Sequence, residues 1–389
     1  MNNMSKYTFS ESILLIISVM LVSCSNDHNY TWDGVVNTNV ISLNPSNDIV
    51  NLSDDFSDFE LIPLDNNRNC MLKDRAKLSV TDSAYYILND DWRSNIFLFD
   101  KNGNYKYSIG RKGHGRGEYD NVNDFYVSKD GLTSVLTFDK ILFYDKSGKF
   151  DRALELNENN GCDYISCVGT SPVLASHYRN KDHLLNIIDP ENNVIEKYIP
   201  IDTTQHIRFS PVLGIRPLQV VNNTICYLDY FSSSFYIIDR EKTDTIKRII
   251  LKSDKMLTEK FAKETVEYYA DYDEIESFVF TGEEIIGLLT IDKKPYNFWI
   301  DINKCQARLS LSSDMMYDFD AYHDGWFYKI VTASWLLNHY KYRSPKTSPL
   351  PDFRKKELGL SPIVPILEPI IQSISEKNNS YILKMRAKQ

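Results

Sequence analysis

A glycine-rich segment holds the densest group of side chains that could bind an anion. Residues 110–119 read GRKGHGRGEY, so cationic or titratable groups alternate with glycine. Cations beside accessible backbone amides favour a negatively charged ligand. The candidate ligand-binding residues of this segment are Arg111, Lys112, His114, Arg116, Glu118 and Tyr119.

The segment does not match a nucleotide-binding loop. A P-loop reads G-x-x-x-x-G-K-[ST] and opens a helix, whereas Gly115 at the sixth position is followed by Arg116-Gly117 and then by a further strand. Two interpretations stay open. The segment is either a tight connection between strands, in which glycines supply left-handed dihedrals, or a binding loop.

Motifs for catalysis are missing from the sequence. None of the 7 histidines lies in H-x-H, in H-E-x-x-H or beside a C-x-x-C pair, so a zinc site could form only by convergence of distant segments. The sequence also has no G-x-S-x-G elbow. We therefore expect no catalytic residue, no metal ligand and no cofactor. The formal net charge of -9 argues against nucleic acid as a partner, because phosphate contacts need a basic surface.

Five aspartates recur after apolar strands and open polar turns. They are Asp100, Asp145, Asp189, Asp239 and Asp301, at intervals of 45, 44, 50 and 62 residues. A four-stranded propeller blade takes about 40 to 50 residues. The turns read DKNG and DKSG, in which aspartate accepts turn amides and glycine takes a positive φ. We interpret these aspartates as turn residues and not as metal ligands.

Two strands near the chain ends predict how the ring closes. FELIPL (59–64) stands alone before the first full repeat, and SYILKMRA (380–387) ends the chain without a following turn. Pairing them would leave no open sheet edge. The sequence thus predicts an all-β, six-bladed β-propeller closed by an N-terminal strand, with seven blades as the rival count. A short helical insertion within 251–272 is expected between blades four and five.

The long connections are expected on one face of this propeller. Segments 110–121, 201–217 and 251–272 join successive blades, and 332–377 joins the second and third strands of the last blade. Such connections emerge together, and loops on rigid strands commonly carry function. We predict binding on this long-loop face. A cationic segment within 339–357 supports this choice, with Lys341, Arg343, Lys346, Arg354, Lys355 and Lys356.

The N-terminus predicts export and a lipid anchor. An apolar run over 13–22 follows Lys6 and is too short to span a bilayer, which is typical of a signal peptide. It ends in LVSC, a lipobox-like sequence in which Cys24 would be acylated; an ordinary signal peptide is the alternative. The expected organisation is a signal peptide over 1–23, a tether and N-terminal segment over 24–56, and the propeller over 57–389. The 5 cysteines after Cys24 are an odd number. The two that are closest in sequence, Cys162 and Cys167, are expected to be buried small hydrophobes that do not form a disulfide.

The features after the first strand-turn unit carry a family resemblance. Gly113, Gly115 and Gly117 precede Glu118-Tyr119, and an Asp124-Phe125 strand follows. With the lipobox, this order resembles the six-bladed, NHL-like β-propeller lipoproteins of Gram-negative envelopes, although Arg116 stands where those proteins commonly have proline. The resemblance implies a protein anchored by lipid in the cell envelope, at the outer membrane, with no assigned chemistry.

Two functional hypotheses follow. The first is a non-catalytic protein that binds a glycan, peptide or envelope protein on the long-loop face and contacts the membrane through its anchor only. The second is a metal-assisted lactonase, hydrolase or lyase with its site at the mouth of the central channel. An enzyme of the second kind would place several inward carboxylate, asparagine or histidine side chains there.

Overall fold

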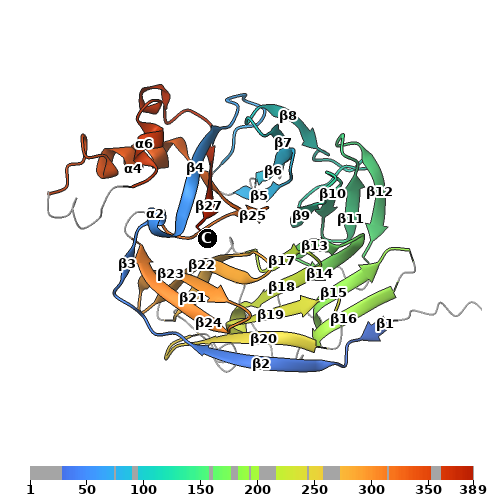
Figure 1. The fold of residues 1–389 in the computed structure, drawn as a ribbon. Coiled ribbons are helices and arrows are strands. Elements are labelled where there is room, and N and C mark those ends of the chain that lie inside the picture. Colours follow the sequence, from blue (N-terminus) through green and yellow to red (C-terminus); the bar gives the residue numbers. More distant parts are fainter. Residues whose placement is uncertain are drawn as a thin grey trace, which may run out of the picture.

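Six sheets surround a central axis in the computed structural model (Figure 1). The structure describes residues 29–73, 76–89, 95–156, 161–176, 183–191, 194–200, 216–242, 245–256, 272–312, 315–351 and 361–388. Each sheet contains four antiparallel strands in order from the axis to the rim, and the innermost strands of neighbouring blades contact one another around the ring. The prediction of an all-β, six-bladed propeller is confirmed.

The first three blades follow the chain without interruption. Blade 1 is formed by β5 (Ala76–Val80), β6 (Ala84–Asn89), β7 (Asn95–Asp100) and β8 (Tyr105–Ile109). Blade 2 is formed by β9 (Asp124–Val127), β10 (Thr133–Leu136), β11 (Lys140–Tyr144) and β12 (Phe150–Glu155). Blade 3 is formed by β13 (Tyr164–Val168), β14 (Ser171–Ala175), β15 (His183–Asp189) and β16 (Val194–Pro200).

The last three blades complete the ring. Blade 4 is formed by β17 (Leu218–Val221), β18 (Thr224–Asp229), β19 (Ser234–Asp239) and β20 (Thr245–Lys252), with the 3-10 turn η2 (Tyr230–Ser232). Blade 5 is formed by β21 (Glu274–Phe280), β22 (Glu284–Ile291), β23 (Lys294–Asp301) and β24 (Gln306–Ser312). Blade 6 is formed by β25 (Ala321–His323), β26 (Trp326–Val331), β27 (Tyr381–Ala387) and β4 (Phe56–Pro63).

Blade 6 is the composite blade that the sequence predicts. Strand β27 pairs antiparallel with β4, and Ile382 lies opposite Ile62 in this register. Both side chains belong to the apolar contact between blades 6 and 1, where Ile382 is fully buried. The pairing satisfies the outer edge of β27 and locks the first and last blades together.

A belt of three strands covers the rim of blades 3 to 5. The belt consists of β1 (Asn29–Thr31), β2 (Val35–Ser42) and β3 (Ile49–Val50), which pair parallel with β16, β20 and β24. Figure 1 shows β2 running along β20 at the outer edge of blade 4. These strands fall in the predicted tether and N-terminal segment over 24–56, and they join the sheets because the outer strands offer unpaired amides and carbonyls. Helix α2 (Leu52–Asp55) then leads into β4.

The repeated aspartates act as turn residues, as predicted. Asp100 Oδ1 accepts the amides of Asn102 and Asn104, each at 2.9 Å. Asp145 Oδ1 accepts the amides of Ser147 and Lys149 at the same distance. The glycines of these turns have positive φ, 82° at Gly103 and 76° at Gly148.

The insertion of blade 6 packs outside the ring. It contains α4 (Ala333–Arg343), α6 (Val364–Leu367) and the 3-10 turn η4 (Ile371–Ser373). Leu336, Ile363 and Leu367 are buried against a cluster that includes Phe56 of β4. Figure 1 shows α4 and α6 beside β4 and away from the axis. The predicted helix within 251–272 and most of the 201–217 connection lie outside the described residues.

The core consists of apolar side chains between neighbouring blades. Cys70, Cys162, Cys167 and Cys226 are buried there without disulfides, so the interpretation of Cys162 and Cys167 as small hydrophobes is confirmed. Among the described residues, no helix is long and apolar enough to cross a membrane. Cys24 lies outside the described residues, and its lipidation stays a prediction.

Candidate functional site

The glycine-rich segment is organised around the Glu118 carboxylate. Oε1 of Glu118 accepts a hydrogen bond from Arg111 Nε at 2.5 Å, and Oε2 accepts the Gly115 amide at 2.8 Å. The hydrogen bond from the Gly115 amide and the Arg111 guanidinium hold the pKa of Glu118 below its usual value. Glu118 therefore bonds within its own loop and compensates the charge of Arg111.

Tight packing explains the glycines of this segment. A Cβ on Gly113 would lie 2.1 Å from Glu118 Oε2, and a Cβ on Gly117 would lie 2.4 Å from the Phe150 ring. Gly117 also has a φ of 75°. Tyr119 is buried, and its hydroxyl donates to the Ile109 carbonyl at 2.9 Å. These contacts favour the interpretation as a connection between blades.

The remaining candidate residues of the segment are spread over the outer surface. His114 Nδ1 lies 3.1 Å from Asp120 Oδ2, and the Arg116 guanidinium lies 5.8 Å from the Phe150 ring centroid. The Lys112 backbone forms a bridge with Tyr119. The structure thus keeps the six predicted residues on one loop but gives them no shared concave surface.

The cations of the blade 6 insertion are also dispersed. Lys346 pairs with Glu368 at 3.0 Å, and Lys341 lies over the Tyr342 ring. Arg354, Lys355 and Lys356 lie outside the described residues. The described part of the insertion therefore gives no cluster that could receive an anion.

A central cavity of about 560 Å³ is the concave site that all six blades build together. Its wall comes from the innermost strands, including Leu78 of β5, Phe125 of β9 and Leu218 of β17. Residues of the turns that follow these strands surround the opening, among them Lys129 and Asn222. These turns form the face opposite the long connections, which we call the short-turn face.

Arg216 forms the floor of this cavity. It precedes β17 of blade 4 and donates to the carbonyls of Leu78 in blade 1, at 2.8 Å, and Phe125 in blade 2, at 3.2 Å. It also lies 3.5 Å from the carboxylate of the buried Asp124. The side chain crosses the axis and joins three blades, while 23% of its surface stays accessible.

Asp320 adds a carboxyl group deep in the same cavity. Its Oδ2 accepts the Ile330 amide at 2.6 Å. Burial raises its pKa to about 6, although the nearby Lys329 and Arg216 charges act in the opposite direction. The cavity thus contains a fixed cation and a carboxyl group whose charge changes near neutral pH.

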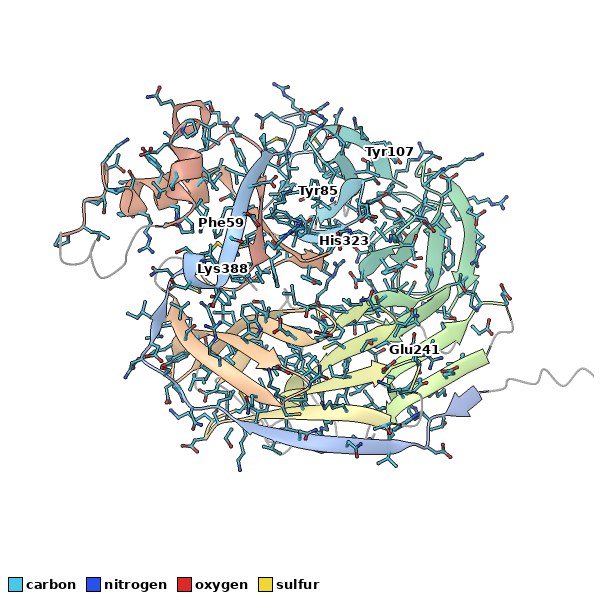
Figure 2. All side chains as sticks on the ribbon, viewed as in Figure 1. Phe59, Tyr85, Tyr107, Glu241, His323 and Lys388 are labelled. Atoms are coloured by element: carbon cyan, nitrogen blue, oxygen red, sulfur yellow. The ribbon has the colours of Figure 1, made fainter. Side chains whose placement is uncertain are left out.

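A hydrogen-bonded histidine–aspartate pair marks the mouth of the cavity. His323 Nε2 of blade 6 lies 2.7 Å from Asp82 Oδ1 of blade 1. The hydrogen bond from His323, with the charges of His323, Lys129 and Lys101, lowers the pKa of Asp82. Figure 2 shows His323 next to the central opening.

Side chains also connect the innermost strands across blade boundaries. Gln219 of blade 4 donates to the Phe278 carbonyl of blade 5 and accepts the Phe280 amide, each at 2.9 Å. Asp124 of blade 2 accepts the Ile165 amide of blade 3 at 3.1 Å. These bonds satisfy the strand edges that face the axis and make the cavity wall rigid.

The described residues contain no group of three or more His, Cys, Asp or Glu side chains that could hold a metal ion. Asp82, Asp320 and His323 all line the cavity; Asp82 and His323 bond to each other, whereas Asp320 accepts the Ile330 amide. The first hypothesis placed binding elsewhere, because these residues are far apart in the chain and carry no shared motif. The second hypothesis placed a site at the channel mouth, and the inward carboxylate, asparagine and histidine side chains that it expects there are present as Asp82, Asn222, His323 and Asp324. Polar residues at the ends of the innermost strands were the sequence feature that could have indicated the cavity.

Comparison with known families agrees with the architecture. A family model described as "Domain of unknown function (DUF4934)" matches residues 36–357. The chain belongs to this family. The match begins in β2, so it includes most of the belt as well as blades 1 to 5. No curated protein matches the chain.

Two crystal structures have the same fold. A protein of Bacteroides fragilis described as exported has a TM-score of 0.66 at 16% identity, covering 90% of this chain and 100% of its own. A member of the duf4221 family from Bacteroides vulgatus has a TM-score of 0.52 at 10% identity, covering 86% of this chain and 98% of its own. Identities this low are informative about the fold alone.

Proposed function

We propose that the protein is a non-catalytic, lipid-anchored envelope protein that binds a small polar ligand in its central cavity. The cavity carries this proposal. Sites for small molecules typically occupy about 300 to 1,000 Å³, and the central cavity falls in this range at about 560 Å³. A monosaccharide unit of a glycan or a short peptide segment has a suitable size.

The lining supports a ligand with both apolar and polar parts. Apolar side chains such as Leu78 and Val220 alternate with hydroxyl and amide groups such as Ser79 and Gln219. Arg216 has five N–H donors; two of them engage the Leu78 and Phe125 carbonyls, and the guanidinium also lies 3.5 Å from the Asp124 carboxylate. A carboxylate or carbonyl oxygen of the ligand is therefore expected to bind near Arg216.

This proposal moves the binding site away from the predicted long-loop face. The described parts of that face hold the self-compensated Glu118 loop and the outward-packed insertion, whereas the cavity opens among the short turns. Residues 201–215 and 257–271, which the sequence predicts on that face, lie outside the described residues. The rigid inner strands favour the cavity because a preorganised wall costs less ordering on binding.

The expected location rests on the N-terminus and on a relative. The signal sequence and LVSC predict export and acylation of Cys24. The structurally similar B. fragilis protein is itself described as exported. An acyl mass on the first mature peptide would support the anchor, and an unmodified Cys24 peptide would contradict it.

A steric block tests the cavity. Ser79 lines it, so Ser79→Trp is expected to fill it, whereas Ser42→Trp adds the same ring on the exposed rim strand β2. Ligand-observed NMR is run with a panel of monosaccharides, uronates, amino acids and dipeptides. The proposal predicts a binder that the wild type and Ser42→Trp share and that Ser79→Trp loses by at least about tenfold, a difference of 1.4 kcal/mol. Equal binding by Ser79→Trp would contradict it.

A further inference from the structure

The seam between blades 6 and 1 gathers positive charge over aromatic rings. Tyr85 of β6 and Tyr328 of β26 meet across this seam with centroids 6.1 Å apart. Lys101, from the turn after β7, holds its Nζ 4.5 Å from the Tyr85 centroid and 5.8 Å from the Tyr328 centroid. Figure 2 shows Tyr85 in the blade next to His323.

Strand β27 brings two more cations to the same seam. Lys384 lies opposite Tyr328 in the strand register, and Arg386 lies opposite Trp326. Lys384 Nζ is 4.3 Å and Arg386 Cζ is 4.6 Å from the Trp326 ring centroid. Three cations from two blades therefore share one aromatic surface on the short-turn face.

Glu60, Asp82 and Asp324 lie near Tyr328 in this seam, but in the described chain neither Lys101 nor Arg386 has a carboxylate at ion-pair distance. Glu60 pairs with Lys384 at 2.9 Å. Asp82 is bonded to His323, and Asp100, the neighbour of Lys101, pairs with Lys106 at 2.8 Å. Burial and the Lys384 charge lower the Lys101 pKa to about 8, against a smaller opposing effect of Asp82.

A matched turn in blade 2 shows that the turn sequence does not cause the burial of Lys101. Lys146 holds the equivalent position in DKSG and is exposed, whereas Lys101 in DKNG is half-buried. The difference comes from the rings beside Lys101, Tyr85 of its own blade and Tyr328 of blade 6. Cation–π contacts contribute about 0.5 to 2 kcal/mol each, but they do not remove the repulsion between like charges.

We propose that this seam binds an oxyanion group, a carboxylate or a sulfate, between Lys101, Lys384 and Arg386. A bound anion would pair with Lys101 and Arg386 and would favour the protonated form of Lys101. The site is separate from the central cavity and does not depend on a ligand there. The alternative is that the aliphatic part of the Lys101 side chain packs on Tyr85 while its ammonium group stays in solvent.

The first experiment measures the titration of Lys101 in the mature full-length protein. Amine acetylation is followed by mass spectrometry across pH 6 to 11, with no added anion, with sodium sulfate or with sodium galacturonate, at matched ionic strength. An anion that binds the protonated form tenfold more tightly raises the midpoint by about one unit. We expect this shift at Lys101 and none at Lys146. An unshifted Lys101 midpoint in both anions would overturn the proposal.

The second experiment uses substitutions and separates the sources of the anion. Lys101→Met is expected to weaken sulfate or galacturonate binding at least tenfold by calorimetry at low salt, with Lys146→Met unchanged. Lys384→Met should raise the Lys101 midpoint in the absence of anion. Tighter galacturonate than sulfate binding would indicate an anionic glycan, and the reverse would indicate a free inorganic oxyanion. Equal loss in Lys146→Met and Lys101→Met would overturn the site.

Discussion

His323 Nε2 lies 2.7 Å from Asp82 Oδ1 and connects the last blade to the first at the mouth of the central cavity. Further out, β4 pairs with β27 in blade 6 and continues along the chain toward β5 of blade 1. Closure of the ring and formation of the proposed site therefore depend on the same pair of blades.

The Asp82–His323 pair gives a pH-dependent prediction. The pKa of Asp82 is lowered in the folded state, so the pair stabilises the protein above the ordinary aspartate range and is lost as the pH falls through the lowered pKa. Asp82→Asn should melt slightly below the wild type at pH 6, and the difference should shrink as the pH falls below the ordinary aspartate range. Thermal melts over pH 3 to 7 test this. A difference that grows toward acid would show that the sign is wrong.

Asp320 gives a prediction of opposite sign. Its folded-state pKa is raised to about 6, so its ionisation destabilises the fold above that pH, and this cost disappears as the pH falls toward the ordinary value of about 4. Asp320→Asn keeps an acceptor for the Ile330 amide. The variant should have a higher urea midpoint than the wild type at pH 8 and a similar one at pH 4. Asp130→Asn, in an exposed turn, serves as the control; a less stable Asp320→Asn at pH 8 would contradict the account.

Substitutions in the glycine-rich segment distinguish its two interpretations, a connection between strands and a binding loop. Arg111→Glu would face Glu118 and should lower the melting temperature, because it removes the 2.5 Å hydrogen bond and adds repulsion. Arg116→Glu, over the Phe150 ring, should change it little, as surface substitutions usually cost within about 0.5 kcal/mol. If Arg111→Glu instead kept the melting temperature and abolished ligand binding, the segment would be the binding loop.

The local repeats made most of the fold predictable from sequence. Asp100 and Asp145 stabilise their turns by accepting hydrogen bonds from the amides two and four residues later. The short motif therefore includes all the residues that form the turn. The closing strand was predictable because FELIPL had no neighbour of its own in the sequence.

The belt and the cavity could not be predicted in the same way. Strand β2 exposes Val35, Val36 and Val40 and buries Ile41, a pattern that reveals no partner, and its parallel pairing with β20 is a long-range contact. Arg216 and Asp82 come together only when six blades close into a ring. Their positions in sequence contain no spacing that indicates a shared site.

The belt gives a prediction about stability. Deletion of residues 25–50 removes all three belt strands and should lower the melting temperature while unfolding stays cooperative, because the six blades keep their four strands. Deletion of residues 25–66 also removes β4 and should abolish cooperative unfolding. Calorimetry of both truncations tests this. Equal melting temperatures would show that β4 does not close the ring.

The central claim is that ligand binds in the cavity from the short-turn face. Hydrogen–deuterium exchange of the full chain, with and without the tightest ligand of the NMR panel, locates binding most directly. We expect slower exchange in the turns around the mouth, at 81–83, 128–132, 222–223 and 324–325, with residues 110–121 unchanged. Protection of 110–121 with no change in these four turns would contradict it.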